Sequence, residues 1–158
     1  MKFTIKKGLD LNIKGSPVEE IKEANLPSEA CIDPRTFKGI KPKLTVNVGD
    51  SIEIGSQLFF DKNNPNCKFV SHHSGKIKDI KFGDRRVIED IVIKTDGANK
   101  SKDYDFNLET RNPLKIREIL LETGMWSFFR QRPFSKIPDT KSSPKSLFIS
   151  TMSTAPNS

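Results

Sequence analysis

The sequence predicts an α+β fold that is mainly β, in which a small barrel or sandwich of short strands precedes a helical segment. Between residues 43 and 97, short runs of alternating apolar and polar residues follow one another closely, separated by glycine turns. Such spacing is typical of a small β-sandwich or barrel. After residue 112 the apolar residues recur at helical spacing instead. The 158 residues suffice for one ordinary domain with appendages.

The expected strands are short, and each is bounded by turn residues. Phe3–Ile13 alternates around Gly8 and predicts an edge strand, whereas residues 18–40 predict only short strands and loops between prolines. The hairpin that contains Asn63-Asn64-Pro65 has turn chemistry, because asparagine tolerates left-handed backbone and proline fixes φ. Further strands are expected at residues 44–48, 51–54, 57–60, 68–70, 76–80 and 87–93.

The helical segment begins at Asn112-Pro113, because proline is tolerated in the first turn of a helix. Gly124 is a candidate C-terminal cap. The apolar run 146–151 predicts a strand with no partner downstream, so we expect the chain to be the N-terminal part of a longer protein. The expected organisation is N-terminal strands and loops (1–40), a barrel (41–99), a helical connector (100–145) and the start of a truncated α/β domain (146–158).

Composition and charge narrow the classes of function. The chain is 34% hydrophobic and 30% charged, it contains no apolar run long enough for a membrane span, and its first residues form no signal-peptide core. The net charge of +7 suits an acidic partner or an anionic membrane surface. Nucleic-acid binding is not expected, because the lysines are interleaved with acidic residues and form no recognition motif. Cys31 and Cys67 are expected to be reduced, small and buried.

Two sets of residues resemble known families. Val48-Gly49-Asp50-Ser51-Ile52, with Gly55, Leu58 and the later Ser74-Gly75-Lys76-Ile77, resembles the biotinyl/lipoyl-type barrel-sandwich hybrid. The whole chain is similar to the alpha subunit of the bacterial Na+-translocating NADH:quinone reductase. The blocks that carry this resemblance are IKKGLDL (5–11), FDKNNP (60–65), SG (74–75), RRV (85–87), LETGMW (121–126) and RPFSK (132–136).

The resemblance implies a peripheral subunit on the cytoplasmic face of the bacterial inner membrane, held there by partner subunits. The complex would oxidise NADH, reduce ubiquinone and export Na+. The resemblance places the NADH site, the flavins and the iron–sulfur centres on partner subunits. It implies no covalently bound cofactor and no catalytic residue in this chain, with ubiquinone as the one ligand that could touch it.

Lys62 is the candidate for a carrier lysine, because Asp61-Lys62 resembles the tip of a lipoyl hairpin. The Asn63-Asn64-Pro65 that follows favours a structural turn. His72 and His73 are adjacent, so on a strand their side chains point to opposite faces and cannot share one ion. No metal site is therefore expected, and we expect one exposed and one half-buried ring.

Residues 126–136 combine four aromatic rings with three cations. One interpretation is a helix end whose rings pack on the sheet while the cations face water. The other is a quinone-side contact, since a quinone headgroup needs flat apolar walls and a donor for each carbonyl oxygen. The candidate contacts are Phe128, Phe129, Arg130, Arg132, Phe134 and Lys136. The alternative functions are a biotin/lipoyl carrier with Lys62 as attachment site and a basic nucleic-acid-binding module.

Overall fold

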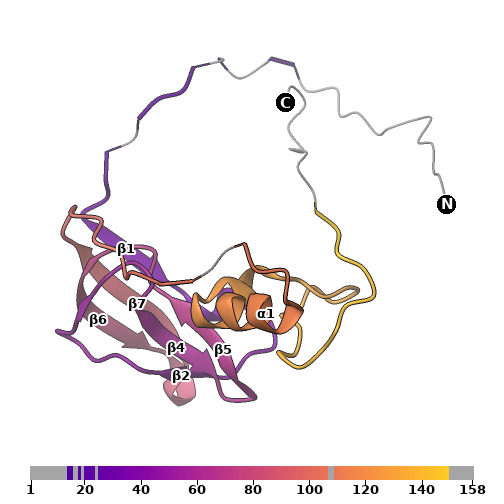
Figure 1. Cartoon of the computed structure of the whole chain (residues 1–158). Helices are drawn as coiled ribbons and strands as arrows, with labels where there is room; N and C mark the ends of the chain where they lie inside the picture. Colours follow the sequence, from indigo (N-terminus) through magenta and orange to yellow (C-terminus); the bar gives the residue numbers. More distant parts are fainter. Residues whose placement is uncertain (1–13, 16–17, 19, 24, 107–108, 150–158) are drawn as a thin grey trace. The chain divides into compact units, whose positions relative to one another are not determined.

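A computed structural model describes residues 14–15, 18, 20–23, 25–106 and 109–149 (Figure 1). By its internal contacts the chain divides into Leu26–Ser142 and the two ends, Met1–Asn25 with Ser143–Ser158. The fold described below is that of Leu26–Ser142. The predicted strand Phe3–Ile13 lies outside the described residues.

The core of this unit is built from two antiparallel sheets. One has the strand order β1-β7-β6-β3 and the other the order β2-β4-β5. One α-helix and three short 3-10 helices accompany the strands in the described residues, which confirms the mainly β prediction. The elements are β1 (Glu29–Ile32), η1 (Pro34–Thr36), β2 (Pro42–Leu44), β3 (Ser51–Ile52), β4 (Gln57–Asp61), β5 (Asn64–Val70), β6 (Gly75–Phe82), η2 (Asp84–Arg86), β7 (Ile88–Thr95), α1 (Pro113–Glu122) and η3 (Met125–Phe128).

Both sheets contribute to one apolar core. Phe59 of β4 and Phe69 of β5 stack at 4.5 Å between ring centroids, and Phe37 meets Phe69 edge-on at 4.6 Å. Offset stacking and edge contacts are the arrangements that aromatic rings prefer. Ile77 of β6 and Ile93 of β7 are opposite each other in register and are both buried. The alternation that predicted the strands therefore places their apolar residues on the inward face.

The hairpin between β4 and β5 is tighter than the sequence predicts. Asp61 pairs with Asn64, so the turn consists of Lys62 and Asn63 alone, and Asn64-Pro65 belongs to strand β5. The buried carboxylate of Asp61 closes this turn by accepting from the backbone N–H of Asn63 at 3.1 Å. Proline is compatible with β5 because β5 is the edge strand of its sheet.

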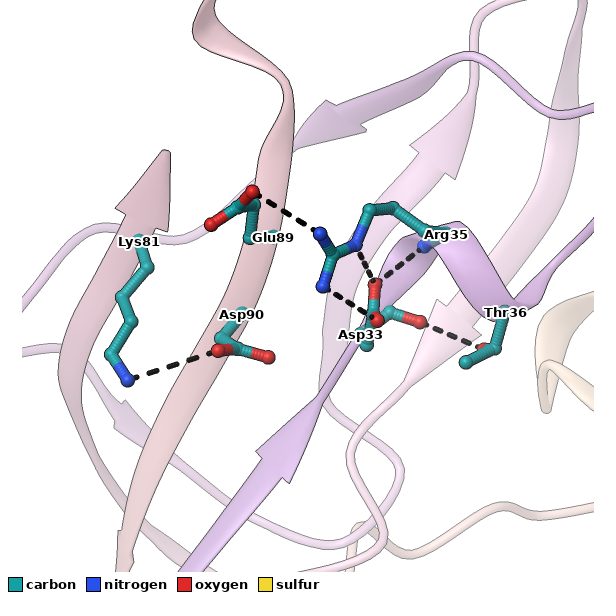
Figure 2. A network of polar contacts seen from close by, with 6 residues as sticks. All are labelled: Asp33, Arg35, Thr36, Lys81, Glu89 and Asp90. Carbon is teal, nitrogen blue, oxygen red and sulfur yellow. Dashed lines mark hydrogen bonds and ion pairs between the residues drawn. The ribbon is translucent and has the colours of Figure 1, made fainter. Parts of the chain in front are cut away.

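A polar network joins the segment after β1 to strand β7 (Figure 2). The guanidinium of Arg35 donates to both carboxylate oxygens of Asp33, at 2.9 and 3.0 Å, and to Glu89 of β7 at 3.2 Å. This hydrogen bonding holds the pKa of Asp33 below its ordinary value. The network therefore fixes η1 against β7, although its exposed position limits its contribution to stability.

Helix α1 begins and ends where the sequence predicts. The side chain of Asn112 caps it by accepting from the N–H of Leu114 at 3.0 Å, and Pro113 is the first helical residue. Gly124 follows in the left-handed conformation, with φ of 76°. The strand expected at residues 146–151 is wrong for its described part, because residues 146–149 form no strand and pair with no described segment. An isolated run cannot satisfy the backbone groups that a sheet ladder pairs.

Gly75 is required where β6 starts beside β7. Its φ is +147°, and a β-carbon there would lie 2.1 Å from the backbone oxygen of Lys94. That oxygen belongs to the strand partner and cannot rotate away. A side chain at this position would force the two strands apart.

We predict that Gly75→Ala lowers the free energy of unfolding by about 3 kcal/mol, because it adds backbone strain to a backbone clash. Gly49→Ala is the matched control, since Gly49 also has positive φ (+95°) but open space around it. Urea unfolding followed by circular dichroism measures both. Equal losses for the two variants would show that the close approach to Lys94 is not the constraint.

Candidate functional site

The aromatic and basic segment 126–136 is positioned by the junction between α1 and β5 (Figure 1). At Gly124 the chain passes so close to β5 that a β-carbon would lie 2.8 Å from Val70 Cγ1. Nearby, Lys68 of β5 donates to the carboxylate of Glu122 at 2.5 Å, which lowers the pKa of Glu122. The helix end and the strand are thus held together by contact and by charge.

Trp126 anchors the segment that follows. Its ring is buried and its indole N–H donates to the backbone oxygen of Pro138 at 2.9 Å. The guanidinium of Arg117 lies 5.4 Å from the centre of the ring and donates to the backbone oxygens of Thr140, at 2.6 Å, and Ser142, at 2.9 Å. Sequence reasoning missed Arg117, because its hydrogen-bond partners lie more than 20 residues further along the chain and no local pattern signals them.

The six predicted contact residues do not form one cluster. Phe129 is half-buried and packs on Trp126 at 5.5 Å, as the structural interpretation of the segment predicts. Phe128 is exposed and meets His72 edge-on at 6.1 Å. Arg130 is exposed, and its guanidinium donates to the backbone oxygens of Ser127 and Phe129.

The remaining three contact residues lie in one turn. The backbone N–H of Gln131 donates to the oxygen of Lys136 at 2.7 Å, which closes residues 131–136 into a loop. Phe134 is 73% exposed, and the ammonium of Lys136 lies 6.0 Å from the centre of its ring. Arg132 is exposed in the same turn. The turn therefore presents an aromatic ring and two cations to solvent.

The described surface includes two open hollows. The larger is lined by β3, β6, β7 and the residues after them, including Lys76, Lys94 and Asp96. The smaller lies between α1 and β5, beside Phe106 and Glu118. None of the six predicted contact residues lines either hollow.

The hairpin with Lys62 has its backbone fixed and the Lys62 side chain exposed. The backbone N–H of Lys62 donates to the oxygen of Lys41 at 2.8 Å, while Asp61 accepts from the N–H of Lys41, also at 2.8 Å. The next residue but one, Asn64, accepts from the hydroxyl of Thr140 at 2.7 Å. The Asp-Lys pair thus has a structural role at the turn.

The two histidines differ in exposure as predicted, with His72 exposed and His73 half-buried. The backbone of His73 is tied to the buried hydroxyl of Ser71, which donates to the oxygen of His73 at 2.6 Å. Within the described residues, no group of three or more His, Cys, Asp or Glu side chains could hold a metal ion.

Two family models match the chain in tandem. The model described as the NqrA N-terminal barrel-sandwich hybrid domain matches residues 3–96, which is more than half of the chain. The model described as the NqrA second alpha/beta domain matches residues 112–158. The chain belongs to the NqrA family.

Curated relatives agree with this assignment, and each is named as the A subunit of a Na(+)-translocating NADH-quinone reductase. The relative from Pseudomonas aeruginosa UCBPP-PA14 is 36% identical over 155 residues, which covers 96% of this chain. Those from Haemophilus influenzae PittEE and Actinobacillus pleuropneumoniae L20 are 38% and 36% identical over 157 residues, or 98% of this chain. The chain spans 35% of the length of each. The resemblance seen in the sequence is therefore confirmed.

In this NqrA-family chain, the helix that the structure describes is too short and too polar to cross a lipid bilayer.

The two cysteines of this family member lie in opposite environments. Cys67 is buried as predicted, and burial raises the pKa of its thiol to about 11. The prediction for Cys31 is wrong, because Cys31 is exposed on β1. Its neighbour Ile32 packs against the core, so the alternation of the strand turns Cys31 outward.

We predict that a maleimide at pH 8 labels Cys31 rapidly and Cys67 only after unfolding. With a pKa of about 11, roughly one Cys67 thiol in a thousand is ionised at that pH, and the thiolate is the nucleophile. Folding raises this pKa from 9.0 to about 11, so ionisation of the thiol favours the unfolded state. The contribution of the neutral thiol to the free energy of unfolding is complete below pH 9 and is lost as the pH rises through about 11.

Mass spectrometry of the labelled protein measures both rates. Cys31→Ser should remove the rapid phase, and Cys67→Ser, the matched control, should leave it unchanged. Equal labelling rates for the two thiols in the native protein would contradict the assignment.

Proposed function

We propose that this chain serves as the N-terminal part of the NqrA component of a Na+-translocating NADH:quinone reductase, where it supports quinone reduction and assembly of the complex. The observation that carries the proposal is the tandem match of two NqrA family models, together with relatives of that name aligned over nearly the whole chain. The other subunits of the complex would be its partners.

The proposal assigns this chain no redox cofactor of its own. The NADH site, the flavins and the iron–sulfur centres would lie on partner subunits, and the chain would sit on the cytoplasmic face of the inner membrane through those subunits. The thiol of Cys67 is buried and neutral, and the histidines lie in turn structure, so the described part of the barrel offers a scaffold.

The quinone side of the proposal rests on the turn 131–136. A quinone headgroup is bound by apolar walls and by donors directed at its two carbonyl oxygens. Phe134 supplies an exposed ring, while Arg132 and Lys136 supply cationic donors beside it. The turn is open to solvent, so a partner subunit would have to provide the remaining walls. Phe128, Phe129 and Arg130 lie on the same segment, and Phe129 would act by holding Trp126 in place.

We predict that Arg132→Ala and Phe134→Ala, made in the assembled complex that contains this chain, each raise the KM for quinone about tenfold. Each substitution removes one contact of roughly 1.4 kcal/mol, which corresponds to a factor of ten. NADH oxidation with a soluble artificial electron acceptor should remain unchanged, because that partial reaction does not use the quinone site.

The matched controls are Lys76→Ala and Phe82→Ala, which remove one cation and one half-exposed ring from β6. They should leave the KM for quinone unchanged. If the turn variants match these controls in quinone KM and in sensitivity to quinone-site inhibitors, the turn does not contact quinone.

The carrier alternative finds one supporting feature, the exposure of Lys62 at the tip of its hairpin. The same hairpin also explains Asp61 without any modification, since its buried carboxylate closes the turn and holds the backbone of Lys41. The scaffold function therefore accounts for more of the observed contacts.

A further inference from the structure

Within Leu26–Ser142, the three longest stretches without aspartate or glutamate include residues 36–49, 62–78 and 125–138, and each contains at least three basic residues. Such segregation is invisible in the overall composition, which suggests a uniformly mixed surface. These basic residues form one positively charged surface only if the fold brings the three stretches together.

The structure does bring parts of all three together beside the β4–β5 hairpin. The backbones of Lys41 and Lys62 are joined by the hydrogen bond of 2.8 Å between them. The stem of Lys136 lies against the loop before β2, since a β-carbon at Gly39 would be 3.5 Å from Lys136 Cδ. Lys43 follows in β2, where its ammonium lies 5.6 Å from the centre of the Phe60 ring.

We call this region the basic end and define it by six exposed cations. No carboxylate among the described residues lies within ion-pair distance of any of them. The six are Lys38, Lys41, Lys43, Lys62, Arg132 and Lys136.

The carboxylates of Asp61 and Asp139, which lie next to the basic end in sequence, form no ion pair with its six cations. Asp61 is buried and accepts from the backbone N–H groups of Lys41 and Asn63. Asp139 accepts from the backbone N–H of Lys141 at 2.7 Å. The positive charge of the basic end is therefore available to a negatively charged partner.

The exposed ring of Phe134 favours a lipid surface as that partner. It lies in the same turn as Arg132 and Lys136, so an aromatic side chain projects among cations. Proteins that bind at membrane interfaces combine lysines, which approach the phosphates, with aromatic rings, which enter the headgroup region. Four to eight clustered cations are typical of surfaces that bind anionic lipids.

We propose that the basic end docks directly on an anionic phospholipid surface. This contact goes beyond the proposed function, because it requires neither quinone nor a partner subunit. It would orient the barrel so that the turn 131–136 faces the bilayer. Electrostatic attraction supplies most of the binding, so the contact weakens as salt screens it.

The test is sedimentation of the 158-residue chain with two kinds of vesicle, one of phosphatidylcholine alone and one of phosphatidylcholine and phosphatidylglycerol in equal parts. We expect binding only to the anionic vesicles, and release by added salt. The double variant Lys41→Gln/Lys62→Gln should lower the partition coefficient about 25-fold, since each lysine near such a surface contributes about fivefold. Circular dichroism confirms that the variants fold.

The matched control is Lys76→Gln/Lys94→Gln, which removes the same charge from the other sheet. It should reduce binding far less than the first variant. Phe134→Trp should give a blue-shifted fluorescence on anionic vesicles only. Three outcomes overturn the proposal: no preference for anionic vesicles, equal losses in the two double variants, or tighter binding through the same lysines to an RNA strand than to the vesicles.

Discussion

Trp126 is buried in the same apolar cluster as Phe59 and Phe69 of the barrel, and the position of the segment 113–142 depends on this contact. Burying a tryptophan removes about 150–250 Å² from water and stabilises the fold by roughly 4–6 kcal/mol. The nearby pair of Lys68 and Glu122 is partly exposed and contributes less than about 1 kcal/mol. Apolar burial therefore contributes more than the ion pair to holding the helix end in place. Gly124 permits this approach because no other residue leaves room for Val70.

The packing of Trp126 also places the boundary between structural units at a different residue from the boundary between the family models. The second NqrA family model begins at residue 112, immediately before α1. In the structure, however, α1 and the residues up to Ser142 belong to the same compact unit as the two sheets. Arg117 explains where that unit ends, because its guanidinium holds the backbone at Thr140 and Ser142. The burial of Trp126 and the hydrogen bonds of Arg117 therefore also position the turn 131–136, which belongs to both proposed surfaces.

Local chemistry made much of the fold predictable. The strands with inward-facing isoleucines, the Asn112-Pro113 helix start and the Gly124 end all follow from patterns within a few residues. Features that depend on distant partners were not predictable. Cys31 points outward because Ile32 takes the inward position on an edge strand, and the attachment of residues 138–142 requires Arg117. For the segment 126–136, the sequence allowed either packed or exposed rings, and it could not distinguish Phe129, which packs inward, from Phe134, which stays exposed.

The segment 113–142 and the barrel should unfold as one cooperative unit. Trp126 is the single tryptophan of the chain, so its fluorescence reports on that segment, whereas the protection of the buried Cys67 thiol from maleimide reports on strand β5 of the barrel. Both signals should be followed through urea unfolding of the same sample. We expect coincident transitions, as in a two-state protein. A Trp126 transition at lower urea, with Cys67 still protected from maleimide, would contradict it.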